Sequence, residues 1–283
     1  MNKDDGVCCL DLCRIAAERS LNAKDAAEIL GQLVEEFGQG GNTQMMGNFA
    51  FDSGLLVADT SEAYVINCAG KHWAAKKVKD VYAMSNRYQI TDDWDLSSFD
   101  KESFPKKNFN QLFEDKNKPD SVCASERENR AQKILEEKKG NISLYDMADI
   151  MRDLGEDSDN YDPEKAELKQ NFVCMHAKPH PDAFWGATGA MITDSNEEGI
   201  IVWMTGTSAN DLSIFKPLFF GIPLPKQLNY QPRGTYDSKS LWWKHEFIHR
   251  KAIMNYKTLK PEIRGRFDEV EKSFFNHTQH SRS

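Results

Sequence analysis

The chain has 283 residues, of which 40% are hydrophobic and 28% charged, and its formal net charge at pH 7 is −8. This length can bury a sizeable core in one large or two modest domains. The acidic balance argues against general affinity for nucleic acid or anionic membranes, and no stretch approaches the roughly 18 consecutive apolar residues of a membrane span.

The beginning of the chain has helical periodicity and continues into a β-hairpin. Within residues 9–37, apolar residues recur at intervals of three and four, which predicts two helices. Asn22 is expected to cap the second helix and Gly38 to end it. A hairpin follows, with a buried strand at 55–58 and a second strand at 63–68, joined by a polar turn.

The middle of the chain changes in composition. Residues 81–90 are a further strand candidate that leads into a loop. Residues 91–140 are rich in Lys, Asp, Glu, Asn and Ser and poor in aliphatic residues, which predicts a charged, partly disordered excursion. An apolar stripe then predicts a helix at about 143–154.

The last part of the chain returns to strands and ends in a helix. Strands are predicted at 172–176, 188–194 and 199–205, and a helix at about 240–259 follows a proline-rich stretch at 217–232. The order of helices, strands, excursion, strands and helix predicts an α+β fold with mostly antiparallel pairing.

The stretch "KHEFIHR" contains the HExxH pattern of many zinc proteases. His245 and His249 would face the same way on a helix, and Glu246 could act as general base on a metal-bound water. Downstream candidates for a third ligand are Glu262, Glu269 and Glu271. Both histidines also border an apolar helix surface, where a hydrogen-bonded structural histidine is the ordinary outcome. We therefore expect no metal and no cofactor, with zinc at His245 and His249 as the alternative.

The six cysteines are scattered without a CxxC pair, and the opening "MNKDDGVCCLDLC" is polar and acidic, unlike a secretory signal. These features predict a reduced chain in the cytoplasm. Cysteine catalysis requires a thiolate with a base or cationic partner. Cys8 and Cys9 instead follow acidic residues, and the other cysteines fall inside predicted elements or in the charged excursion. No activated nucleophile is therefore expected.

Three polar residues at strand ends are candidates for a binding site. Asn86 and Arg87 stand where the strand at 81–90 leads into a loop, and their amide and guanidinium groups suit an oxyanion or a carboxylate. A turn asparagine and a surface arginine are the alternative. His176 lies at the end of another predicted strand, with His180 four residues further on. A histidine there either lines a site or caps the strand.

Six stretches, taken in order, resemble the secernin branch of the dipeptidase-A family over about residues 6–255. They are "LDLCRIAAERSLNAKDAAEILGQLVEEFGQGGN", "LLVADTSEAYVINCAGKHWAAKKV", "MSNRYQI", "VCMHA", "WMTGTSANDLSIFKPLFFG" and "LWWKHEFIHR". The resemblance implies a four-layer αββα N-terminal-nucleophile hydrolase fold, in one domain over residues 1–283 with 91–140 as an excursion. It also implies cysteine-peptidase ancestry, dipeptide hydrolysis in bacterial relatives, and a cytosolic role linked to regulated exocytosis in animal secernins.

The chain also departs from this family. The family's nucleophile strand precedes the block that resembles "DDGVC", and this chain begins just before that block, so we expect the first strands to be missing. Cys8 matches a cysteine sometimes found in that block, which is not the nucleophile. "ATGAM" (187–191) and "SANDLS" (208–213) stand where the family has Thr-Thr-Ala-Ser-Met and Ser-Ala-Pro-Cys-Leu-Ser. Asn86 and His176 match family positions, which implies that Asn86 donates to an oxyanion and His176 lines the pocket.

The expected function is that of a secernin-like protein, a cysteine peptidase by descent that is catalytically silent in this form. Its expected partners are proteins of secretory traffic, with short peptides as substrates if it is active. The resemblance also implies that "KHEFIHR" is a packing helix, because the family carries a similar block with no zinc assigned. The alternatives are an active dipeptidase through Cys8 or Cys9 and a zinc hydrolase through His245 and His249.

Overall fold

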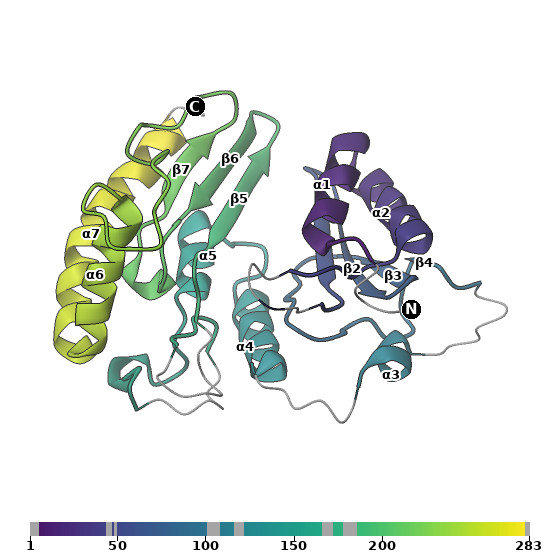
Figure 1. The fold of residues 1–283 in the computed structure, drawn as a ribbon, viewed down its shortest axis with the longest axis horizontal. Helices are drawn as coiled ribbons and strands as arrows, with labels where there is room; N and C mark the ends of the chain where they lie inside the picture. The colour runs from purple at the N-terminus through teal and green to yellow at the C-terminus, as the bar shows by residue number, and fades with distance from the viewer. Residues whose placement is uncertain are drawn as a thin grey trace. The chain divides into compact units, whose positions relative to one another are not determined.

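The computed structural model describes residues 6–43, 47, 50–100, 108–115, 122–165, 172–177 and 186–280. The chain divides into two compact units, Met1–Asp120 and Ser121–Ser283. Each unit combines helices with an antiparallel sheet, which confirms the α+β class (Figure 1). The expectation of a single domain over residues 1–283 stays a prediction, and each unit is described by itself.

The first unit contains three helices and four strands among its described residues. They are α1 (Cys9–Arg19), α2 (Ala23–Phe37), β1 (Gly54–Ala58), β2 (Ala63–Ala69), β3 (His72–Lys77), β4 (Leu96–Ser97) and α3 (Phe109–Phe113). The strands pair in the order β1-β2-β3-β4. The predicted caps of α2 are confirmed: the side chain of Asn22 accepts the N–H of Asp25, and Gly38 ends the helix at φ 75°.

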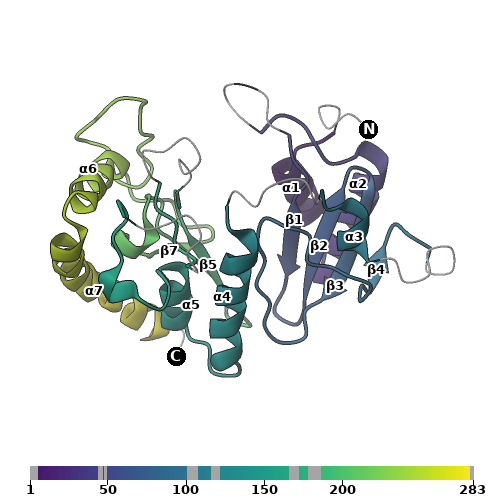
Figure 2. The ribbon, with the colours of Figure 1, turned by 90° about the horizontal axis from the view of Figure 1, so that it is seen from below.

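The sheet of the first unit buries apolar side chains on both faces. Helices α1 and α2 cover one face, where Leu30 packs with Ile66 and Trp73 (Figure 2). The Trp73 ring lies so close to α2 that a Cβ built on Gly31 would be 2.2 Å from it. The opposite face holds a second cluster that includes Val65 and Phe109.

Residues 81–90 form irregular backbone where the sequence predicts a strand. The side chain of the buried Asn67 on β2 explains the difference. Its Oδ1 accepts the backbone N–H of Gln89 at 2.9 Å and that of Ile90 at 3.0 Å. These two N–H groups are therefore satisfied by a side chain in place of a neighbouring strand.

The described part of 91–140 differs from the expected exposed excursion. It contains β4, α3 and α4 (Ala124–Glu137), and the side chains of Trp94 and Phe109 are buried. The stretch has few aliphatic residues, but its aromatic side chains provide large apolar surfaces. The ring of Phe99 contacts the rings of both Trp94 and Phe109, so aromatic packing organises this stretch.

The second unit has a three-stranded antiparallel sheet in the order β5-β6-β7. Its elements after α4 are α5 (Leu144–Met151), η2 (Ser158–Asn160), β5 (Met191–Asn196), β6 (Gly199–Met204), η3 (Asn210–Leu212), β7 (Lys216–Phe219), α6 (Leu241–Ile253) and α7 (Tyr256–His280). The buried side chains of Ile192, Trp203 and Phe215 pack with Phe275 of α7, which lies alongside the sheet in Figure 1.

Two sequence predictions in the second unit are wrong. Residues 172–176 are not a strand, because the N–H groups of Val173 and Cys174 both donate to the carbonyl oxygen of Asp153, at 3.0 and 2.9 Å. The helix expected at 240–259 ends at Ile253, and α7 then continues to His280. Across the described residues, no helix has the length and apolar character required to cross a membrane.

Candidate functional site

A buried polar cluster in the second unit brings Cys174, His176 and Asp211 together. One side-chain donor atom from each lies within 4.8 Å of the other two. The thiol of Cys174 donates to Oδ1 of Asp211 at 3.3 Å, and Nε2 of His176 is 2.9 Å from the same oxygen. The hydroxyl of Tyr256, at the start of α7, donates to Oδ2. Asp211 is therefore the centre of this cluster.

The backbone around Asp211 is held by contacts to distant segments. Ala209 has a left-handed conformation with φ 57°, and its N–H donates to the carbonyl oxygen of Ala187 at 2.9 Å. The guanidinium of Arg152 donates to the carbonyl oxygens of Asn210 and Ser213 at 3.3 and 3.0 Å. These contacts fix the short η3 turn and hence the direction of the carboxylate.

The environment sets which groups of this cluster are charged. Burial raises the pKa of Asp211, whereas His176 and the hydroxyl of Tyr256 lower it. The lowering effect is the larger, so the pKa of Asp211 is below the usual range. Burial, together with the Asp211 carboxylate, raises the pKa of the Cys174 thiol and of Tyr256. At neutral pH this arrangement keeps Asp211 ionised and both Cys174 and Tyr256 protonated.

A second polar network involves the HExxH residues of α6. Ser208 Oγ donates to Glu246 Oε2 at 2.6 Å, and Nδ1 of His249 lies 3.2 Å from the same oxygen. Nε2 of His245 instead lies 2.8 Å from the carbonyl oxygen of Ser208 and 3.2 Å from Oγ of Ser213. Nδ1 of His249 also lies 3.4 Å from Oγ of Ser208, so both histidines contact Ser208 but at different atoms. Burial lowers the pKa of each histidine.

The downstream glutamates do not complete a zinc site with His245 and His249. Glu271 is buried and pairs with Arg152 at 2.6 Å. Within the part of the chain that the structure describes, the one group of metal-ligating side chains is Cys174, His176 and Asp211. The pairing of HExxH with a downstream glutamate therefore has no support in the geometry.

The structure places the sequence candidates in different units. Asn86 is exposed and Arg87 half-buried at a bend in the first unit, while His176 belongs to the buried cluster of the second. Cys8 is half-buried at the N-cap of α1. His180 lies outside the described residues. Their assigned roles in binding and catalysis stay predictions.

Sequence reasoning missed Asp211 and Tyr256. The only signal for Asp211 was its block, "SANDLS", which differs from the family pattern at this position. Tyr256 gave no signal of its own, because it falls inside the predicted helix at 240–259 and in no motif. Both residues become visible as site residues only when η3 and α7 meet in the fold.

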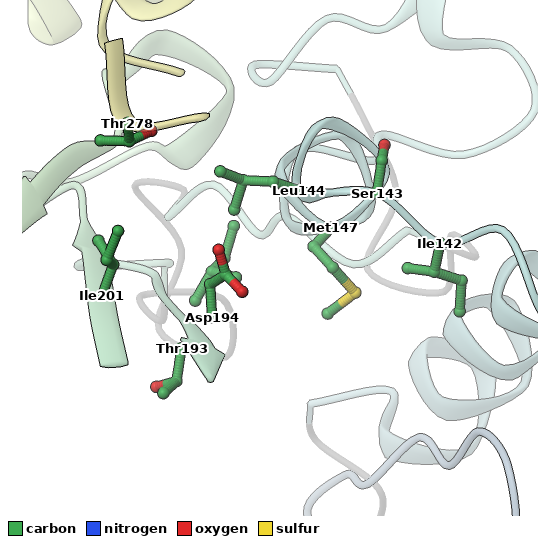
Figure 3. A pocket seen from close by; sticks show the side chains of 9 residues that line it. Ile142, Ser143, Leu144, Met147, Thr193, Asp194, Ile201 and Thr278 are labelled. Carbon is green, nitrogen blue, oxygen red and sulfur yellow. The ribbon is translucent and has the colours of Figure 1, made fainter. Parts of the chain in front are cut away.

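A separate pocket of about 350 Å³ lies between α5, β5, β6 and the end of α7. Figure 3 shows its side chains. The lining residues are Ile142, Ser143, Leu144, Met147, Ile192, Thr193, Asp194, Ile201 and Thr278. Among the described residues, this lining has neither a thiol nor an imidazole, so it provides apolar surface with a few polar groups and no cysteine–histidine pair.

A search against models of known protein families finds no match to this chain.

Proposed function

We propose that the chain is a secernin-like protein, related by descent to the dipeptidase-A cysteine peptidases, and that it is catalytically silent. It acts as a cytoplasmic binding or regulatory protein linked to regulated exocytosis, with proteins of secretory traffic as partners. Six sequence blocks in the order of that family support the relationship. The two antiparallel sheets with their helices support the α+β class to which the proposed fold belongs.

The surroundings of Cys174 are the observation that carries the proposed silence. This thiol lies within 4.8 Å of the nearer ring nitrogen of His176, yet it donates to the carboxylate of Asp211. A catalytic thiol needs a base that accepts its proton and a positive environment that stabilises the thiolate. Asp211 supplies negative charge instead. In a Cys-His-Asp triad the imidazole lies between the thiol and the carboxylate. Here the carboxylate of Asp211 lies between the thiol of Cys174 and the imidazole of His176, so the order of the groups does not fit a triad.

Two other described cysteines are likewise unsuited to nucleophilic attack. Burial, with smaller contributions from neighbouring cysteines, raises the pKa of Cys13. Burial also raises the pKa of Cys68, with smaller contributions from Asp52 and neighbouring thiols. Loss of an activated nucleophile lowers an enzyme's rate by many orders of magnitude even where an oxyanion hole is kept. Neither Cys13 nor Cys68 is therefore a suitable nucleophile for peptide-bond hydrolysis.

Hydrolysis of a dipeptide panel tests this proposal. The purified chain is compared with an active bacterial member of the dipeptidase-A family at equal concentration. We expect no turnover above the uncatalysed background. Turnover comparable to that of the active relative, lost in Cys8→Ser and kept in Cys13→Ser, would overturn the proposed silence and establish the dipeptidase alternative through Cys8.

A further inference from the structure

We propose that the second unit binds one zinc ion through Cys174, His176 and Asp211, with His249 as the fourth ligand. This ligand set differs from the HExxH pair, because it uses only one histidine of that motif. It is also independent of the proposed function, since it rests on side-chain geometry alone. The zinc ion would join the 172–177 segment, η3 and α6 at a single point.

The first argument is the spacing of the three buried donors. Zinc binds nitrogen and oxygen at about 2.0–2.2 Å and sulfur at about 2.3 Å, so tetrahedral donors lie about 3.3–3.6 Å apart. Cys174 Sγ is 3.3 Å from Asp211 Oδ1, and His176 Nε2 is 2.9 Å from that oxygen. All three donors lie within 4.8 Å of one another. Only small side-chain shifts would centre them on one ion.

The second argument is that His176 is buried without hydrogen bonds. Its side chain is 0% exposed, and neither ring nitrogen makes a hydrogen bond to the described residues. Nε2 of His176 and Oδ1 of Asp211 are therefore 2.9 Å apart, but their relative orientation is not that of a hydrogen bond. A buried polar atom outside hydrogen-bond geometry is costly, typically by about 1–3 kcal/mol. Coordination of a metal ion by the nitrogen facing Asp211 would remove part of that cost.

His249 is oriented as a ligand by its own carboxylate partner. Its Nδ1 lies 3.2 Å from Glu246 Oε2, and an ionised carboxylate can only accept, so Nδ1 carries the proton. Nε2 then has a free lone pair, and it is buried without a hydrogen bond to any described residue. The rings of His249 and His176 have centroids 5.8 Å apart, and His249 lies outside the 4.8 Å group of the other three donors, so its side chain would move toward them to complete the site. Carboxylate–histidine pairs of this kind commonly orient the histidine ligands of zinc.

The charges of the proposed site balance. Zinc carries two positive charges, the Cys174 thiolate and the Asp211 carboxylate carry one negative charge each, and the two imidazoles are neutral. On binding, the S–H bond of Cys174 breaks, its proton leaves to solvent, and the sulfur lone pair forms the Zn–S bond. Tyr256 keeps its hydrogen bond to Oδ2 of Asp211, which leaves Oδ1 to the metal. Lys260 of α7 also interacts electrostatically with this carboxylate.

Metal content and cobalt spectroscopy of the full chain test the proposal. After removal of metal and dialysis against zinc, we expect about one zinc per chain by plasma mass spectrometry. Replacement by Co²⁺ should give a thiolate-to-cobalt charge-transfer band and the intense d–d absorption of a tetrahedral site. A chain that takes up no zinc, or a cobalt complex without a thiolate band, would overturn the site. This measurement needs no variant and so does not depend on how any variant folds.

Variants then assign the ligands. Cys174→Ser and His176→Ala should lose stoichiometric zinc, and Glu246→Gln should weaken binding about 10- to 100-fold by releasing His249. His245→Asn and the exposed His277→Ala are the matched controls and should retain the ion. Loss of zinc in His245→Asn with retention in Cys174→Ser would establish the HExxH site instead. Unchanged affinity in His249→Ala would overturn the assignment of the fourth ligand.

Discussion

Replacement of Glu271 by alanine should destabilise the second unit by about 3 kcal/mol. Glu271 and Arg152 form an ion pair at 2.6 Å, and their side chains are only 5% and 12% exposed. Breaking a buried pair by removing one partner costs about 3–5 kcal/mol, because the other charge is left uncompensated. Arg152 keeps its bonds to the carbonyl oxygens of Asn210 and Ser213, which places the expected loss at the lower end.

The same substitution removes the acceptor of a backbone N–H. Phe215 N–H donates to Glu271 Oε2 at 2.7 Å in the buried interior. Native-state hydrogen exchange should therefore show faster exchange at Phe215 in Glu271→Ala, and urea unfolding followed by circular dichroism should show the lower stability. Glu269→Ala, an exposed position on the same helix, is the control and should change stability by less than about 0.5 kcal/mol. A loss below about 1 kcal/mol in Glu271→Ala, with unchanged exchange, would refute this account of the ion pair.

Three further predictions concern close packing, a buried amide and a buried amine. Gly31→Ala should lower the thermal stability of the first unit by about 1–3 kcal/mol in calorimetry, because its Cβ would overlap the Trp73 ring; an unchanged melting temperature would contradict this. Asn67→Ala should accelerate hydrogen exchange of the Ile90 amide, which loses its acceptor; retained protection would contradict it. Burial lowers the pKa of Lys216 from 10.5 to about 8, so the unfolded chain binds more protons between these values and stability should rise with pH across that window. Denaturation of wild type and Lys216→Met at pH 7.5 and 10 checks it, since only the wild type should show this rise.

Elements with local signals were predictable from the sequence. Asn22 and Gly38 mark the ends of α2 through side-chain capping and a positive φ, which are both properties of single residues. The hairpin of β1 and β2 has a short turn, and Asp59 stabilises that turn by accepting the N–H groups of Ser61 and Glu62 at 2.7 and 2.9 Å. Local chemistry alone determines such features.

Elements that depend on distant partners were not predictable. The stretches 81–90 and 172–176 have strand-like composition, but their N–H groups donate to Asn67 and Asp153 respectively, which lie far away in sequence. The continuation of α7 to His280 includes Pro261, which normally indicates a helix boundary.

The candidate site was predictable only in part, for the same reason. His176 was recognised from the block "VCMHA" and His249 from HExxH, each by a local motif. Asp211, which joins Cys174 to His176, lies in a short turn whose direction is fixed by Arg152 and Ala187. The grouping of these side chains is a product of tertiary packing, so no local pattern contains it.

Residue-resolved thiol alkylation tests the proposed absence of an activated nucleophile most directly. The native chain is treated with iodoacetamide at pH 7 with a metal chelator present, and the labelling of each cysteine is followed over time by mass spectrometry. We expect no cysteine to react faster than a free cysteine thiol, and the buried Cys68 and Cys174 to react far more slowly. Labelling of any one cysteine many times faster than the free thiol would contradict a catalytically silent chain.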